Sequence, residues 1–300
     1  MASHQDWFRL FYEGLFWLVV SLLLSVFLYT AARKTQRNLV SEEANGRSKD
    51  MTLEEAYLVK TRIAEREFPF VFSAATNAVF FKAEGIPSIA KLVARAARRS
   101  TPRKGPSAAP LDLLGRPGAS ATKAAVDRVN YIHSFYRPSG KMSDDDLLYV
   151  LCLFALEPIR CVERFEYRRL TALERRALAT LWKALGEELR IPFDRLGEGG
   201  GDALEWLAEL ERWGQEYEER FREKTPESVF LGEKQLDAWV SGVPLFFLRR
   251  WARECVAVLI EPGLRRAMGI ETPSTLAVVL VESVIGARKF IRRCLCTLWW

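Results

Sequence analysis

One histidine is the side chain in this sequence with the clearest capacity for chemistry. His133 lies in the stretch RVNYIHSFYR, residues 128–137, and is one of only two histidines in the chain of 300 residues. A neutral imidazole can hold a metal or move a proton near neutral pH, but a single helical histidine more often has a structural role. Helical spacing places His133 in a polar row beside an apolar stripe, so both interpretations stay open. The row comprises Val126, Asn130, His133 and Arg137, and the stripe comprises Ala125, Val129, Ile132 and Tyr136.

The remaining sequence excludes several kinds of catalytic site. A long apolar run separates the second histidine, His4, from His133, which excludes an iron site with two histidines and a carboxylate, and also the zinc hydrolase motifs. No GxSxG motif, P-loop or glycine-rich dinucleotide turn occurs. A haem needs one axial ligand, an apolar helical pocket and basic groups for its propionates. His133, with Arg128 and Arg137 on the same helix and the apolar segment 147–156, is compatible with a haem site without requiring one.

The composition indicates a globular protein with ample material for a core and a mild positive charge. Apolar residues make up 49% of the chain, and 44 Lys and Arg against 38 Asp and Glu give a net charge of +6. No zinc-ligand spacing, RNP-like aromatic pattern or basic arm is present, so we expect no nucleic-acid partner. The five cysteines, an odd number without framework spacing, predict reduced thiols in a cytosolic environment.

Residues 14–32 (GLFWLVVSLLLSVFLYTAA) predict a membrane anchor. These nineteen residues carry no charge, and as a helix they would be about 28 Å long, close to the hydrocarbon thickness of a bilayer. A cleaved signal peptide is the alternative, but Asp6 and Glu13 precede the run, which is also long for a signal. Basic residues follow the run, so the positive-inside rule places residues 1–13 in the lumen and residues 33–300 in the cytoplasm. Those basic residues are Arg33, Lys34, Arg37, Arg47 and Lys49.

A polar tether, residues 33–50, and one all-α domain, residues 51–300, are expected after the anchor. No stretch alternates with period two, whereas apolar residues recur at helical spacing. Capping boxes at Thr52 and Thr171 and a serine cap at Ser143 mark three helix starts. Dense proline and glycine predict a long loop over residues 100–122. The expected helices cover residues 52–67, 70–84, 87–99, 122–135, 143–156, 171–189, 203–223 and 274–293, with one or two more within residues 235–261.

A central buried helix is expected from the uniformly apolar segment 147–156 (LLYVLCLFAL), which is too short to span a bilayer. Three aspartates follow its serine cap, where carboxylates suit the helix dipole. Pro158 is expected to kink or interrupt this helix, so that Glu157 presents a carboxylate at the break.

The last expected helix, residues 274–293, joins an apolar segment to a basic end. Glu282 interrupts the apolar run well short of membrane length. Two interpretations remain open: a core helix with a basic last turn, or an interfacial helix that lies on a membrane surface.

Several ordered motifs lie between residues 128 and 193, about a fifth of the chain. They are Asn130-x-x-His133, Glu157-Pro158-Ile159-Arg160, Arg164 through Arg168, Thr171-x-x-Glu174, and Trp182-Lys183 with Gly186. Together they resemble the fungal ER-bound oxygenases of the mycophenolic-acid type, which belong with the bacterial rubber oxygenases (latex-clearing proteins). The resemblance implies a globin-like helical core with additional helices, preceded by the single N-terminal transmembrane helix.

The resemblance also implies an activity: a haem-dependent oxygenase of fungal secondary metabolism that uses dioxygen to cleave a carbon–carbon double bond. The substrate would be a lipophilic isoprenoid or meroterpenoid chain dissolved in membrane lipids, and the site of action the endoplasmic reticulum membrane. Glu157 would take an allylic proton, and Arg128 would orient dioxygen or a haem propionate. The residues expected to hold haem b are Arg128, Asn130, His133, Arg137 and Arg164.

One departure from the family pattern concerns the haem ligand. The bacterial enzymes ligate haem through a histidine on the following helix, and the corresponding stretch here, residues 149–152 (YVLC), has none. Either His133 is the axial ligand, or Cys152 ligates as a thiolate, or haem is absent. We favour His133, because burial raises the pKa of a thiol and so disfavours the thiolate.

Other interpretations stay open beside the oxygenase. The arginines of the motifs could form ion pairs with Glu157, Glu163 or Glu166 in place of a catalytic role. The chain could also be a non-catalytic, membrane-tethered scaffold or lipid-binding protein. A third possibility is an enzyme of the same fold that hydroxylates or cyclises a terpenoid.

Overall fold

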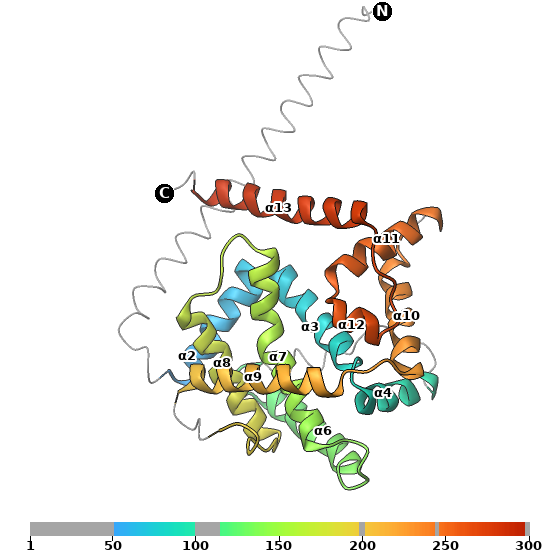
Figure 1. Cartoon of the computed structure of the whole chain (residues 1–300). Helices are drawn as coiled ribbons and strands as arrows, with labels where there is room; N and C mark the ends of the chain where they lie inside the picture. Colours follow the sequence, from blue (N-terminus) through green and yellow to red (C-terminus); the bar gives the residue numbers. More distant parts are fainter. Residues whose placement is uncertain (1–50, 100–114, 198–201, 244–245, 298–300) are drawn as a thin grey trace, which may run out of the picture.

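The computed structural model describes residues 51–99, 115–197, 202–243 and 246–297, and this part of the chain is built from helices without a strand (Figure 1). The predicted all-α fold is therefore confirmed for these residues. In chain order the elements are α2 (Leu53–Thr61), the π-helical turn η1 (Arg62–Glu67), α3 (Pro69–Ala83), α4 (Pro87–Arg99), α6 (Ser120–Tyr136), α7 (Asp144–Phe165), α8 (Ala172–Glu188), α9 (Ala203–Phe221), α10 (Pro226–Val240), α11 (Phe246–Leu259), α12 (Pro262–Ala267) and α13 (Thr275–Thr297).

The predicted membrane anchor falls outside the described residues. This is also true of the lumenal segment 1–13, the tether 33–50 and most of the predicted loop 100–122. Among the helices that the structure does describe, none combines the length and the apolar character that crossing a bilayer requires. The anchor and the domain boundaries therefore stay predictions.

Helix starts follow the local capping signals of the sequence. Capping boxes begin α2 at Thr52, α7 at Ser143 and α8 at Thr171. In each box the side chain of the cap accepts from a backbone N–H, and an acidic residue three positions later accepts from the backbone of the cap. The three predicted helix starts are confirmed.

Helix α7 is the centre of the fold. It packs against α3, α8 and α9, and Figure 1 shows it inside the bundle that these helices form. Burial on several sides matches the uniformly apolar segment 147–156, so the predicted central helix is confirmed. The buried residues of α7 include Leu147, Leu148, Tyr149, Leu151, Cys152, Leu153, Ala155, Leu156, Ile159 and Val162.

Pro158 does not interrupt α7, which corrects the expectation from sequence. The helix continues through Pro158 to Phe165. A proline inside a helix costs about 3 kcal/mol because it removes one backbone hydrogen bond and crowds the preceding turn. Glu157 and Ile159 on either side of it are buried, so packing of this segment in the core offsets that cost. Glu157 consequently lies inside a continuous helix and not at a break.

Helix α6 packs with a different face from the one expected. Val126 is buried and Val129 packs against the core, but Ile132 of the predicted apolar stripe is exposed. Tyr131 and Phe135 are exposed too, with their rings in edge-to-face contact 4.8 Å apart. The polar row that contains His133 instead faces the end of α8.

Helices α7 and α9 approach closely at a glycine. A Cβ atom placed on Gly214 of α9 would lie 2.4 Å from Sγ of Cys152. The thiol is also directed at the α9 backbone, since it donates to the carbonyl oxygen of Leu210 at 3.4 Å. Only a residue without a side chain allows α9 to lie this close to α7.

We expect Gly214→Ala to lower the free energy of unfolding by roughly 1–3 kcal/mol, because the new methyl group overlaps the thiol. Adding Cys152→Ala should restore part of the loss by vacating that space. Thermal unfolding followed by circular dichroism in detergent measures both changes. Gly286→Ala is the matched control, since it also lies in a helix but has no atom within 4 Å of the added Cβ. Equal stability of Gly214→Ala and the wild type would contradict the close contact.

Candidate functional site

A cluster of charged residues extends from the buried Lys82 and Glu157 to partly exposed partners. Nζ of Lys82 donates to Oε1 of Glu157 at 2.8 Å and also to Oε1 of Glu261. Arg160 donates to the same Oε1 of Glu157 at 3.0 Å and to Glu211 at 3.2 Å. Lys82 and Glu157 are both buried. We call these five residues the Lys82 cluster.

Four elements place the cluster. Lys82 lies in the last turn of α3, and Glu157 and Arg160 lie one turn apart on α7. Glu211 lies on α9, and Glu261 is the residue before α12. The α3 segment around Lys82 is otherwise uncharged and packs against α7. Apolar packing of α3 on α7 therefore carries the lysine into the core, where a carboxylate of α7 meets it.

The charges of the cluster stabilise one another. Burial alone would lower the pKa of Lys82, but the carboxylates of Glu157 and Glu261 outweigh it and raise that pKa above its usual value. Burial would raise the pKa of Glu261, but Lys82 and Arg222 hold it below its usual value. Burial raises the pKa of the neighbouring Cys161 thiol to about 12. At neutral pH the lysine and Glu261 are therefore ionised and the thiol is not.

The cluster continues toward α9 through Arg222. Its guanidinium pairs with Glu218 at 2.8 Å and with Glu261 at 3.5 Å. Glu218 also accepts a hydrogen bond from the hydroxyl of Tyr149, which is buried on α7. Nε of Arg222 is buried without a hydrogen-bond partner in the described part of the chain. Four elements, α3, α7, α9 and the start of α12, thus meet at one polar centre.

His133 lies away from this centre, on the face of α6 that meets the C-terminal end of α8. On one side of it, Nδ2 of Asn130 donates to the carbonyl of Glu188 at 3.0 Å, and on the other, Arg137 donates to the carbonyl of Arg190 at 3.1 Å. Burial and the charge of Arg137 lower the pKa of His133, so the imidazole is neutral at pH 7. Its Nδ1 is buried and lacks a hydrogen-bond partner among the described residues.

The structure separates His133 from Glu157. Arg137, one turn after His133, pairs with Asp144 at the start of α7. Glu157 lies thirteen residues further along α7, which at the helical rise is about 20 Å. The two predicted catalytic residues therefore lie near opposite ends of a long helix.

Haem does not fit on His133 in this arrangement. A macrocycle bound through the imidazole would extend over the neighbouring residues of the same helical face, and residues three and four positions apart are only about 5–6 Å apart there. Asn130 and Arg137 are those residues, and both are already joined to the end of α8. A haem would have to separate α6 from α8. The free Nδ1 and the neutral imidazole suit a ligand, but the contacts of Asn130 and Arg137 hold the end of α8 against this face of α6.

Cys152, the alternative ligand, does not fit either. Its thiol touches the backbone of α9 at Gly214, and burial raises its pKa to about 12. The thiol is therefore protonated and enclosed. No group of three or more His, Cys, Asp or Glu side chains in the described residues could hold a metal ion.

The remaining predicted site residues have other roles in the structure. Arg128 is exposed on α6, with its guanidinium over the ring of Tyr131, and nothing in its placement supports a role with dioxygen. Arg164 donates to the carbonyl oxygens of Val258 and Leu259 and pairs with Glu282 at 3.4 Å. The alternative interpretation, in which motif arginines form ion pairs, holds for Arg160 with Glu157. Arg164 and Arg168 also form ion pairs, but with partners other than the expected ones: Glu282 for Arg164, and Glu67 and Glu174 for Arg168.

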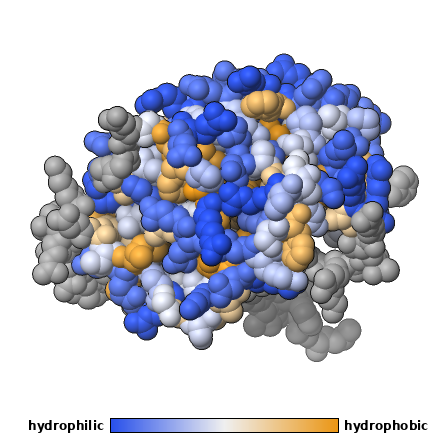
Figure 2. All heavy atoms as spheres, turned by 90° about the horizontal axis from the view of Figure 1, so that it is seen from below, coloured by the Kyte–Doolittle hydropathy of each residue, from blue (hydrophilic) through white to orange (hydrophobic). Residues whose placement is uncertain are grey.

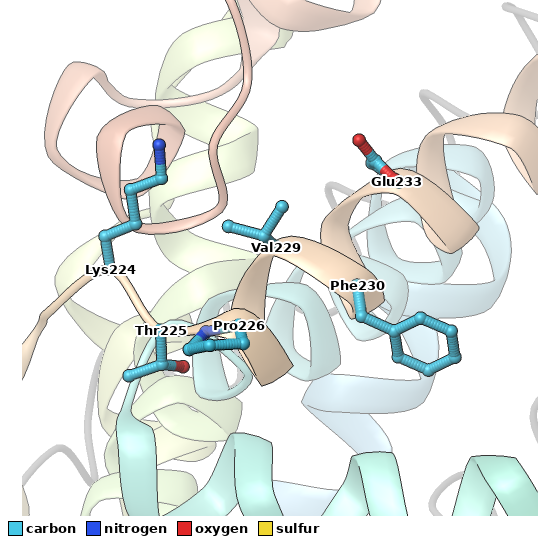
Figure 3. Close-up of a pocket in the computed structure, with 6 residues that line it drawn as sticks. All are labelled: Lys224, Thr225, Pro226, Val229, Phe230 and Glu233. Atoms are coloured by element: carbon cyan, nitrogen blue, oxygen red, sulfur yellow. The ribbon is translucent and has the colours of Figure 1, made fainter.

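A surface pocket of about 560 Å³ lies at the start of α10 (Figure 3). In Figure 3 the side chains of Lys224, Val229 and Glu233 point to the same side, whereas Phe230 points away from them. The pocket is open to solvent, and its first lining residue, Lys224, lies two residues after Arg222. Its lining residues are Lys224, Thr225, Pro226, Val229, Phe230 and Glu233.

Sequence reasoning identified Glu157 but missed Lys82 and Glu261. Lys82 is the one charged residue in the α3 segment 69–83, and an isolated lysine in an apolar helix indicates a buried partner. Glu261 had no comparable signal, because a glutamate before Pro262 is an ordinary helix start.

We expect Lys82→Met to lower the free energy of unfolding by roughly 3 kcal/mol, because it removes a cation from the buried carboxylate of Glu157. Adding Glu157→Gln should recover part of the loss. Denaturant unfolding followed by circular dichroism gives both values. The control is Lys91→Met on α4, where the lysine is exposed and the change should be near zero. Equal effects of the substitutions at Lys82 and Lys91 would show that the pair is not buried.

The comparisons with known proteins agree on one family. The family described as ER-bound oxygenase mpaB/B'/rubber oxygenase, catalytic domain, matches residues 68–293. ER-bound oxygenase mpaB' of Penicillium brevicompactum is 33% identical over 254 residues, 81% of this chain and 60% of that protein. ER-bound oxygenase mpaB of Penicillium roqueforti (strain FM164) is 35% identical over 273 residues, 88% of this chain and 90% of that protein.

The chain is shorter than some of these relatives. ER-bound oxygenase mpaB of Penicillium brevicompactum is 36% identical over 189 residues, and this chain spans only 48% of its length and 60% of the length of mpaB'. No solved structure matches the chain, so the globin-like arrangement stays a prediction. The match over residues 68–293 includes the Lys82 cluster and every predicted site residue. The chain belongs to the family of ER-bound oxygenases and rubber oxygenases.

Proposed function

We propose that this protein is a membrane-associated oxygenase that uses dioxygen to cleave a carbon–carbon double bond in a lipophilic isoprenoid or meroterpenoid chain. The family match over residues 68–293, with relatives named ER-bound oxygenases, is the observation that carries the proposal. The Lys82 cluster is the candidate site, because buried groups with shifted pKa values gather at functional sites.

Glu157 is the residue proposed to move a proton. Both of its cationic partners, Lys82 and Arg160, donate to the same oxygen, Oε1. These contacts fix the carboxylate and leave Oε2 without a hydrogen bond in the described residues. That oxygen can accept a proton from an allylic carbon, and the two cations hold the carboxylate in one orientation until it does.

Oxygen chemistry of this kind needs a redox group, and haem b is the group that the family resemblance implies. Neither His133 nor Cys152 suits haem as an axial ligand in this packing. The end of α8 lies against the face of α6 that carries His133, and α9 encloses the thiol of Cys152. Haem dependence and a role in secondary metabolism stay predictions.

The proposed location is the endoplasmic reticulum membrane. The relatives are named ER-bound, and the basic residues after the predicted span 14–32 favour a lumenal N-terminus with the domain 51–300 in the cytoplasm. An isoprenoid chain partitions into the bilayer, so an enzyme held at its surface meets a high local concentration of substrate.

Incubation of the detergent-solubilised protein with a prenylated substrate under ¹⁸O₂ tests the reaction. We expect mass spectrometry to find label in the two carbonyl fragments. Glu157→Gln should lower the rate of product formation by roughly 10²-fold, whereas Glu163→Gln, an exposed glutamate on the same helix, should leave it unchanged. A labelled hydroxyl group on an uncleaved chain would indicate hydroxylation instead. Absence of label from both fragments, or full activity of a folded Glu157→Gln, would contradict the proposal.

The absorption spectrum of protein purified with ample haem tests the ligand separately. In a preparation that shows a Soret band, we expect His133→Ala to retain it, because α8 closes the face of α6 that carries the imidazole. Ile132→Ala, at the exposed neighbouring position, is the control. Loss of the band in His133→Ala alone, with helical content unchanged, would make His133 the axial ligand and show that α6 and α8 part to admit haem.

A further inference from the structure

Helix α13 is attached to the rest of the molecule by polar contacts. Arg288 donates to the carbonyl oxygen of Phe165 and to Glu166, the latter at 2.7 Å. Arg292 pairs with Glu166 as well, and Lys289 donates to the carbonyl oxygen of Glu163 at 3.2 Å. The inward side of the basic half of this helix is therefore charged.

The outward side of α13 is apolar. Leu276, Val279 and Phe290 have 69%, 58% and 69% of their surface exposed. Val279 and Phe290 follow Leu276 by three and fourteen residues, which places the three side chains on one face of the helix. Ala277 and Val281 lie on the opposite face, toward the body. Further exposed apolar residues beside them are Leu280, Val284 and Ile291. This orientation is the reverse of an ordinary surface helix, which turns its apolar face to the core.

Helix α11, which packs against α13, extends the apolar surface and adds cations to it. Leu248 and Trp251 are exposed at its N-terminal half, and the two residues between them, Arg249 and Arg250, are exposed as well. Residues 246–293 contain nine Lys and Arg against four Glu, a net charge of +5, whereas the whole chain has +6. Arg288, Lys289 and Arg292 of this segment face the body, so the cations that lie beside the exposed apolar residues are Arg249 and Arg250.

The surface lies on one side of the molecule. Figure 1 shows α13 along the upper edge of the body, with α6 at the lower edge and no other described element above α13. The lower face, seen in Figure 2, is mostly hydrophilic with scattered apolar residues. The apolar, basic surface and the hydrophilic surface are therefore on different faces.

We propose that the outer face of α13, with the N-terminal half of α11, lies on an anionic lipid bilayer. Aliphatic and aromatic side chains would enter the boundary between headgroups and acyl chains, and arginines beside them would contact lipid phosphates. The positive charge beside the apolar residues favours an anionic lipid bilayer over a protein surface that has few acidic residues. This contact is additional to the predicted anchor 14–32 and does not depend on the oxygenase chemistry.

Photo-crosslinking in the full-length chain tests the proposal. Phe290 is replaced by benzoylphenylalanine, and the protein is reconstituted into vesicles of phosphatidylcholine and phosphatidylserine. Phe135 on α6, 60% exposed, is the matched control position. We expect about tenfold more phospholipid adduct at Phe290 than at Phe135, because only the former would lie among lipid chains. Both positions are exposed, so neither replacement disturbs the core.

Two outcomes would overturn the proposal. Equal amounts of lipid adduct at the two positions would show that the anchor alone brings the protein to the vesicle. Crosslinks from Phe290 to a second copy of the chain, in place of lipid, would show that the face is a protein interface.

The charge requirement is tested in the same assay. We expect less lipid adduct from Phe290 in vesicles of phosphatidylcholine alone, and a similar reduction when Arg249→Gln and Arg250→Gln are combined in the anionic vesicles. The same two substitutions should not change the background adduct at Phe135. An adduct that is insensitive to both changes would overturn the anionic part of the proposal.

Discussion

A buried lysine shared by the buried carboxylate of Glu157 and the partly exposed carboxylate of Glu261 is the interaction on which the placement of α3, α7 and α12 depends. Lys82, Glu157 and Glu261 come from these three elements, and each would be costly to bury alone. A shift of any one element would leave a charge in apolar surroundings without its partner. Apolar packing brings the helices together, and the ion pairs then select one register among the ways in which they could pack.

The same constraint explains how the chemistry is distributed along α7. The N-terminal end of this helix meets α6 and His133 through Arg137 and Asp144, whereas the C-terminal half carries Glu157. Between them lies the tightest apolar packing, where Cys152 touches α9. His133 thus lies near the C-terminal end of α8, whereas the polar centre of the core lies around Lys82 and Glu157.

The fold was largely predictable because its signals are local. Capping boxes, the apolar segment 147–156 and the absence of period-two alternation each depend on residues close in sequence. Where local preference and packing disagree, packing decides: Pro158 stays inside α7 although proline disfavours the helix interior. Glu157 could be singled out from its motif, but its partner Lys82 is 75 residues earlier, and one sequence contains no signal that joins them.

The attachment of α13 has a consequence for how this helix behaves. The basic half of the helix contacts the body through guanidinium and ammonium groups on the carboxylate of Glu166 and on backbone carbonyls. Glu166 is buried, so removal of these cations would leave its carboxylate without a counter-charge, at a cost of roughly 3–5 kcal/mol. The joint is therefore shielded from dissolved ions, and it fixes the basic end of the helix to the body while the apolar outer face stays exposed.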